Sequence, residues 1–233
     1  MLKIKQTFVY CDLISRHFYK INICIFMFNL TTIILYQLLI VCCFIVAFLK
    51  RKENKFPIYI YFLFVAIIEI YCYFNKQNSF PYQFGSLFYA AFFTFYYAHF
   101  TPQLKKLIYM VGGFSFAIIL YYFLQFDSNF PSEMGITAAL LFISFSLIWF
   151  YEQIKRPGEN FIIHNETFWI SAANLLWGII FLFRVSMMYW LAAKDLAFLI
   201  ILDKIFKISL LLTYVFLLIG VTKKQYSAHE RLA

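Results

Sequence analysis

Long apolar runs separated by short polar segments are the dominant pattern of the chain. A membrane-spanning helix needs about 20 predominantly apolar residues, within a range of about 17–25. Runs of suitable length and composition lie at 22–49, 57–74, 80–98, 107–125, 134–151, 168–192 and 196–221. The five prolines fall at or just outside the ends of these runs, where proline disturbs a helix least. The pattern predicts an all-α, polytopic transmembrane bundle of seven helices, with six or eight helices as alternatives.

The polar segments between the runs are too short to hold a soluble domain, and the alternating segments of a β-barrel are absent. We therefore expect one seven-helix transmembrane domain over residues 22–221 and a cytoplasmic tail over 222–233. Residues 1–21 are basic and allow three interpretations. They form an interfacial amphipathic helix, or they belong to an extension before a true start at Met27. In the third interpretation they stay on the cytoplasmic side, and one of the seven runs does not cross the membrane.

Composition excludes the soluble classes. Hydrophobic residues make up 64% of the chain and charged residues 13%, whereas soluble domains contain about 45–50% and about 25%. The net charge is +9. In a membrane protein this excess indicates loops that fix the orientation and contact anionic lipid, and we expect no nucleic-acid partner.

The basic residues are shared unevenly between alternate loops. The first, third and fifth loops and the tail carry eleven Lys and Arg, whereas the other three loops carry only Lys76 and Lys194. Cytoplasmic loops are the ones enriched in Lys and Arg. The distribution predicts a multi-pass membrane protein with an N-out/C-in orientation.

Five ionisable side chains lie inside the predicted spans, where each costs about 2.5–3.5 kcal/mol on insertion scales. They are Glu69, Arg184, Asp203, Lys204 and Lys207. In the N-out orientation they lie at one depth, in the outer half of the second, sixth and seventh helices. We expect these helices to enclose a polar pocket open to the outside, with Glu69 and Arg184 as a cross-helix pair. Lys204 points away from Asp203 and is expected to snorkel.

Helical spacing adds two aromatic residues to the candidate pocket. Asp203 and Lys207 are four residues apart and share a face, as do Glu69 and Tyr73. Trp177 lies on the stripe of Arg184. The candidate ligand-binding residues are therefore Glu69, Tyr73, Trp177, Arg184, Asp203 and Lys207. The five intramembrane charges sum to +1, which favours an anionic ligand or a lipid head group.

Other interpretations of the same residues remain open. The charges form a buried salt-bridge network that only fixes helix packing, or they line a path for ions. Gln83, Ser86 and Tyr89 add hydrogen bonds to the pocket, or they only bind neighbouring helices. The pair Gly112 and Gly113 predicts a close contact between helices.

Motifs of enzymes, metal sites and cofactor sites are absent from the sequence, so we expect no catalytic residue, no metal and no cofactor. The intramembrane charges favour a ligand or signalling pocket in a non-enzymatic protein, with membrane lipids as partners. A cytoplasmic or membrane signalling partner would contact loops 50–56 and 152–167 and the tail from 222. The alternatives are a small transporter or channel, a lipid-modifying membrane enzyme, or an effector subunit of a larger complex.

Residues 28–222 resemble the short seven-helix membrane proteins of Bacteroidetes, many of them encoded near sensor histidine kinases. Four features carry the resemblance, which also implies a bacterial inner membrane: KRKENK in the first loop, Glu69 late in the second helix, FPYQFGSLFY in the third and ETFWISAANLLWGIIFLF in the sixth. Gln83, Ala173-Asn174 and Arg184 depart from the pattern. The resemblance implies a sensor or signalling-accessory role and assigns no functional residue.

The spacing of Asp203 and Lys207 is also similar to that in the seventh helix of microbial rhodopsins, where the lysine carries retinal. Those proteins have an arginine and carboxylates in the third helix. The third run of this chain has no charged residue, so we expect no retinal.

Overall fold

The computed structural model describes residues 31–53, 56–74, 80–125, 131–155, 162–194 and 196–223. Seven α-helices are found in this part of the chain. They are Thr31–Leu49, here called the N-terminal helix, α2 (Tyr59–Phe74), α3 (Phe80–Phe100), α4 (Lys105–Leu124), α5 (Ser132–Lys155), α6 (Glu166–Lys194) and α7 (Leu196–Thr222). The predicted all-α class and the seven helical runs are confirmed. The predicted segment 1–21 lies outside the described residues, as does most of the tail.

Five of these helices are long and apolar enough to cross a membrane: the N-terminal helix, α4, α5, α6 and α7. α2 is also apolar but has 16 residues. α3 has 21 residues, and its four tyrosines lower its mean hydropathy. The chain is therefore a polytopic membrane protein.

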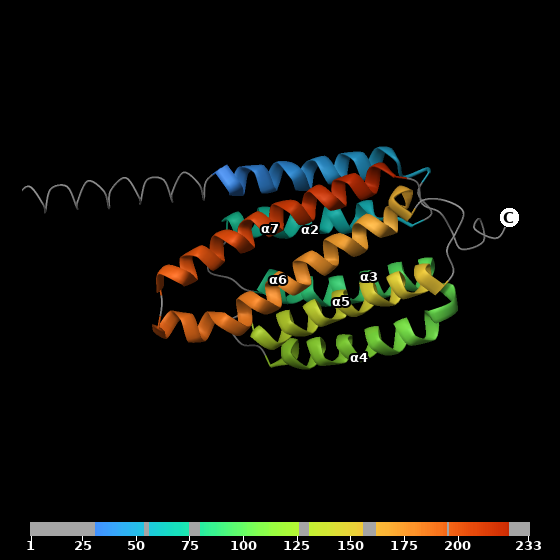
Figure 1. The fold of residues 1–233 in the computed structure, drawn as a ribbon. Helices are drawn as coiled ribbons and strands as arrows, with labels where there is room; N and C mark the ends of the chain where they lie inside the picture. Colours follow the sequence, from blue (N-terminus) through green and yellow to red (C-terminus); the bar gives the residue numbers. More distant parts are fainter. Residues whose placement is uncertain are drawn as a thin grey trace, which may run out of the picture.

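The helices run alternately in opposite directions (Figure 1). The N-terminal helix and α7 finish at the same end, where the Lys50 ammonium donates to the carbonyl oxygen of Thr222 at 2.5 Å. A cation is favourable at this position because the last carbonyls of a helix carry partial negative charge. We name this end the Thr222 end. The opposite end, where α2 finishes and α3 begins, is the Phe74 end.

The helices close into a ring, with α4 outside it. α6 packs along both α5 and α7, α3 packs on α2 and α5, and α4 covers α3 and α5. The N-terminal helix closes the ring between α7 and α2. The Tyr36 ring meets Tyr214 edge-on at 5.0 Å between centroids, and the Phe48 ring meets Tyr59 at 6.0 Å.

The outer surface of the bundle is apolar, and its interior combines apolar side chains with buried polar ones. Large apolar side chains such as Phe114 and Ile154 are 70% and 81% exposed. Ser146, Ser171 and Thr167 are fully buried between helices. Lipid tolerates the exposed apolar surface, and polar side chains inside a membrane bundle link helices by hydrogen bonds. The burial pattern thus supports a membrane location independently of helix length.

The contact between α3 and α4 depends on one glycine. A Cβ atom at Gly112 would overlap the side chain of Thr94, including its hydroxyl. The Thr94 hydroxyl donates to the carbonyl oxygen of Ala90 at 2.6 Å, which holds that side chain in place. Gly113, next in the same helix, has open space at its Cβ position. Only the first glycine of the predicted pair therefore permits the close approach.

We expect Gly112→Ala to lower the free energy of unfolding by about 1–3 kcal/mol, because the added methyl group forces α4 away from α3. Gly113→Ala is the matched control and should leave stability unchanged or slightly raised. The free energies of unfolding of both variants can be measured in mixed micelles by raising the fraction of denaturing detergent. Equal stability of the two variants would contradict the assigned contact.

Candidate functional site

A cavity of about 710 Å³ lies inside the ring of helices. Its lining comes from the N-terminal helix, α2, α3, α5, α6 and α7, and none of the lining residues belongs to α4. The cavity extends from the Phe74 end to about mid-helix on α3 and α5, at Tyr89 and Phe142. It reaches farther on α2 and α7, where Tyr61 lies in the first turn of α2 and Leu217 lies within two turns of the end of α7. Its size is within the range of about 300–1,000 Å³ that is usual for small-molecule sites.

The structure brings five of the six predicted site residues together in this cavity. Glu69, Trp177, Arg184, Asp203 and Lys207 all line it. The side chain of the sixth, Tyr73, lies outside what the structure describes. That these residues bind a ligand remains a prediction.

One wall of the cavity is a cluster of three charges on α6 and α7. Arg184 Nη2 donates to Asp203 Oδ1 at 3.2 Å, and Lys207 Nζ lies 2.6 Å from Asp203 Oδ2. The Arg184 guanidinium also lies over the Phe206 ring, 4.6 Å from its centroid. All three charged side chains are about one-third exposed. Two cations share one carboxylate, so this wall carries a net charge of +1. We call it the cationic wall.

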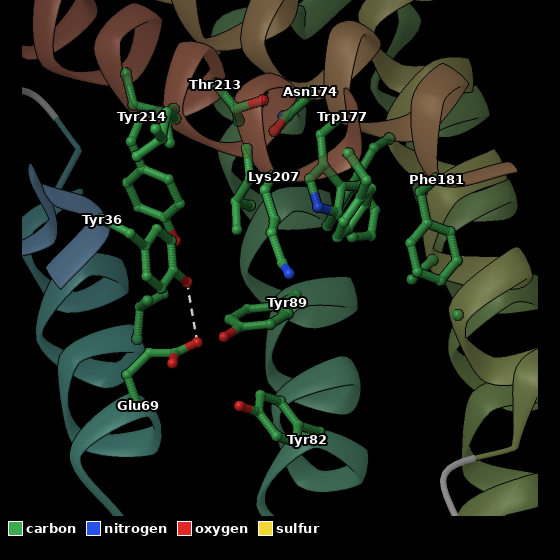
Figure 2. Close-up of a pocket in the computed structure, with 18 of the residues that line it drawn as sticks. Tyr36, Glu69, Tyr82, Tyr89, Asn174, Trp177, Phe181, Lys207, Thr213 and Tyr214 are labelled. Atoms are coloured by element: carbon green, nitrogen blue, oxygen red, sulfur yellow. Dashed lines mark hydrogen bonds between the residues drawn. The ribbon is translucent and has the colours of Figure 1, made fainter. Parts of the chain in front are cut away.

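The opposite wall carries the carboxylate of Glu69. The Tyr36 hydroxyl donates to Glu69 Oε1 at 2.9 Å, and Gln37 also hydrogen-bonds to this carboxylate. Tyr82 and Tyr89 of α3 turn their hydroxyl groups toward the same side of the cavity (Figure 2). We call this the acidic wall.

The expected cross-helix pair of Glu69 with Arg184 is wrong. Glu69 is bonded to Tyr36 and Arg184 to Asp203. The order of the helices in the ring explains the difference. α6 packs directly along α7, which brings Asp203 to Arg184, whereas α2 packs on α3 and faces α6 across the cavity.

The deep part of the cavity is apolar and aromatic. Trp177 stacks on Phe181 at 4.9 Å and contacts Phe142 at 5.5 Å between ring centroids. Figure 2 shows Trp177 and Phe181 beside the opening into which the Lys207 ammonium extends. Closer to the Thr222 end, Tyr96 and Tyr97 are fully buried. The described cavity is therefore bounded on that side by packed side chains.

Sequence reasoning missed most of the tyrosines of the cavity. Five line it, from four helices: Tyr36, Tyr61, Tyr82, Tyr89 and Tyr214. Only Tyr89 was a candidate, together with Ser86, which also lines the cavity. Gln83 is buried but is not part of the lining. The chain has 18 tyrosines, so residue type alone could not distinguish the five that line the cavity from the others.

A polar seam between α3 and α6 continues from the cavity toward the Thr222 end. Asn174, which lines the cavity, donates to the Tyr97 hydroxyl at 3.2 Å. The same hydroxyl lies 3.0 Å from Ser171 Oγ and 3.4 Å from Ser146 Oγ. One turn farther, the Tyr96 hydroxyl donates to Thr167 Oγ1 at 3.4 Å. We call these groups the α3–α6 seam.

The first turn of α6 anchors the seam at the Thr222 end. The Asn165 side chain caps the helix by accepting from the Thr167 amide at 3.0 Å. The Trp169 indole donates to the carbonyl oxygen of Ile163 at 2.8 Å, which ties the helix to the preceding loop. Glu166 is fully buried in this turn, where the helix dipole favours a negative charge.

No family model matches the chain, and no curated protein or solved structure matches it either. The resemblance to the seven-helix proteins of Bacteroidetes therefore rests only on the sequence features quoted above. Within the described residues, no group of three His, Cys, Asp or Glu side chains is placed to hold a metal ion. The cavity is the feature from which a function can be argued.

We expect Tyr97→Phe to lower the free energy of unfolding by about 1–2 kcal/mol, because it removes a buried hydroxyl that serves three partners. Tyr121→Phe is the control, since Tyr121 is 61% exposed on the outer surface of α4. Denaturing-detergent titration measures both variants. A Tyr97→Phe protein as stable as the control would show that the seam contributes nothing to folding.

Proposed function

We propose that this protein is a non-enzymatic membrane sensor or signalling accessory whose cavity binds a ligand that carries an anionic group. The observation that carries the proposal is the cationic wall, with the Lys207 ammonium directed into a cavity inside a membrane bundle. The anionic group would lie against Arg184 and Lys207. An anionic lipid head group and a soluble anion both have this chemistry.

Charge balance supports an anionic occupant. Each ionised side chain at membrane depth is costly, and Asp203 compensates only one of its two cationic neighbours. An anion between Arg184 and Lys207 would offset the net charge of these three side chains. Both cations are about one-third exposed, so such a group can reach them without unpacking the bundle.

The shape of the cavity favours binding over passage. On α3 the lining ends at Tyr89, and Phe93, Tyr96 and Tyr97 are buried between that residue and the Thr222 end. A path along α3 toward the Thr222 end would have to pass through this packed aromatic layer. For this reason we place the transporter or channel interpretation second.

The α3–α6 seam offers a physical route from the cavity to the other end of the bundle. Asn174 belongs to both the cavity lining and the seam. A ligand can shift a conformational equilibrium only through contacts that differ between two states. Hydrogen bonds of Asn174 and Tyr97 that change on binding would be such contacts, and they lie two helical turns from the α6 cap at Asn165.

The proposed orientation is N-out/C-in in a bacterial inner membrane, with the cavity in the outer half. It is supported by the basic residues near the Thr222 end, including Lys50, Lys105 and Lys155. A cytoplasmic partner would then contact loops 50–56 and 152–167 and the tail. The resemblance to proteins encoded beside sensor histidine kinases is consistent with a partner on that side.

Reporter fusions test the orientation. A green fluorescent protein fused after Lys223 should fluoresce, and alkaline phosphatase fused after Asn78 should be active, because that enzyme folds only outside the cytoplasm. The converse pair of fusions should both be silent. The opposite pattern at both positions would overturn the orientation and would place the cavity in the inner half.

Native mass spectrometry of gently solubilised protein tests the binding proposal. Wild-type protein should retain a co-purifying anion or anionic lipid, and Arg184→Gln should lose it because one of the two cations that hold it is gone. Lys204→Gln is the matched control. It removes the same charge from α7 at a residue that does not line the cavity, and it should retain the ligand.

A ligand that remains bound in the Arg184→Gln variant, or a wild-type protein that carries none, would contradict the binding proposal. In that case the charges would serve only to pack α6 against α7.

A further inference from the structure

The cavity has positive charge on one wall and negative charge on the facing wall. The anionic group proposed above would contact only the cationic wall. Glu69 lies on the acidic wall, among tyrosine side chains, and Arg184 and Lys207 lie on the cationic wall. A ligand with anionic charge alone would bring that charge into a cavity that already contains the Glu69 carboxylate. A ligand with separated charges of both signs would match both walls.

We propose that the cavity binds a zwitterionic phospholipid with a primary ammonium group, with its phosphate at Arg184 and Lys207 and its ammonium at Glu69. The inference deepens the proposed function, since it names the ligand class of the same cavity. It adds a second binding subsite, the acidic wall, to the cationic one.

The acidic wall has the chemistry of an ammonium site. The Tyr36 hydroxyl occupies one oxygen of the Glu69 carboxylate at 2.9 Å, and a carboxylate has further acceptor positions for the three donors of an ammonium group. Tyr82 and Tyr89 turn their hydroxyl groups toward the same wall (Figure 2). A tyrosine hydroxyl can accept a hydrogen bond from an ammonium group.

The cationic wall has the chemistry of a phosphate site. Arg184 supplies a planar set of donors that suits phosphate oxygens, and Lys207 adds a mobile ammonium. In the cavity as it stands, Asp203 accepts from both of them at 3.2 and 2.6 Å. A phosphate group would compete with this carboxylate, so Asp203 limits the affinity for phosphate while it lowers the net charge of the wall from +2 to +1.

The rest of the cavity fits an acyl chain better than a soluble zwitterion. Phe142, Trp177 and Phe181 form an apolar surface in its deep part. Ile33, Leu210 and Leu217 add aliphatic side chains to the lining. A volume of about 710 Å³ has room for a head group and the first carbons of the chains.

Lipid competition measured by native mass spectrometry tests this inference. The protein would be reconstituted in mixed micelles with equal amounts of phosphatidylethanolamine and phosphatidylglycerol, and separately with soluble phosphoethanolamine. Wild-type protein should retain phosphatidylethanolamine over phosphatidylglycerol by about tenfold, the effect of one charge-assisted contact. Soluble phosphoethanolamine should bind more weakly than the lipid, because it lacks the apolar chains.

Two variants separate the subsites. Glu69→Gln should remove the preference for phosphatidylethanolamine and leave phosphatidylglycerol bound. Arg184→Gln should weaken the binding of both lipids. Glu133→Gln is the matched control for the first variant, since Glu133 is an exposed carboxylate that does not line the cavity. If Glu69→Gln does not fold, Tyr82→Phe replaces it. It removes a hydroxyl that points to the same wall from a side chain that is 43% exposed, and it should reduce the preference.

The outcomes distinguish the two proposals. An unchanged lipid preference in folded Glu69→Gln would overturn the zwitterion inference and leave the anion site standing, provided that Arg184→Gln still loses lipid. Binding of soluble phosphoethanolamine as tight as that of the lipid would overturn the phospholipid assignment. Lipid binding that Arg184→Gln does not affect would overturn the proposed function itself.

Discussion

The cationic wall of the cavity depends on the two ion pairs of the Asp203 carboxylate. The carboxylate accepts from Arg184 and from Lys207, and without it two cations would face each other at membrane depth. Because the partners lie on α6 and on α7, the carboxylate also fixes how these two helices lie along each other. The cation of Arg184 is stabilised further by the face of Phe206. One side chain thus reduces the cost of charge in the bundle and holds the wall from which the proposed ligand site is built.

The same constraint explains why the polar residues gather inside. With no water in the hydrocarbon region, a hydroxyl or amide must find its partner within the bundle, on its own helix, as Thr94 does, or on a neighbouring one. The Tyr97 hydroxyl meets this requirement with Ser146, Ser171 and Asn174, on α5 and α6. The outer surface needs no such partners and is built from apolar side chains. The hydrogen bonds between buried polar groups and the apolar outer surface therefore have the same cause, the absence of water in the hydrocarbon region.

The sequence predicted the helices, the set of charged residues and, from the i, i+4 spacing, the contact of Asp203 with Lys207. It did not predict which charges pair across helices. Helix positions follow from apolar runs, because backbone hydrogen bonding in lipid leaves few alternatives. Glu69, Arg184, Asp203 and Lys207 could be grouped because charges at one depth in a bundle tend to face its interior. Which of them pair across helices depends on the order of the helices in the ring, and no local sequence pattern encodes that order. The tyrosines of the cavity stayed hidden because aromatic residues are 23% of the chain.

The geometry of the cationic wall also indicates how an occupied cavity would differ from an empty one. Of the two contacts that Asp203 makes, the one with Lys207 lies within α7, and only the one with Arg184 joins two helices. An anion that drew Lys207 away from Asp203 would break only a contact within α7 and would not move one helix relative to another. An anion that drew Arg184 away would weaken a link between α6 and α7, and α6 is the helix that carries Asn174, Ser171 and Thr167 of the seam. Competition for Arg184 is therefore the step by which binding would reach the Thr222 end.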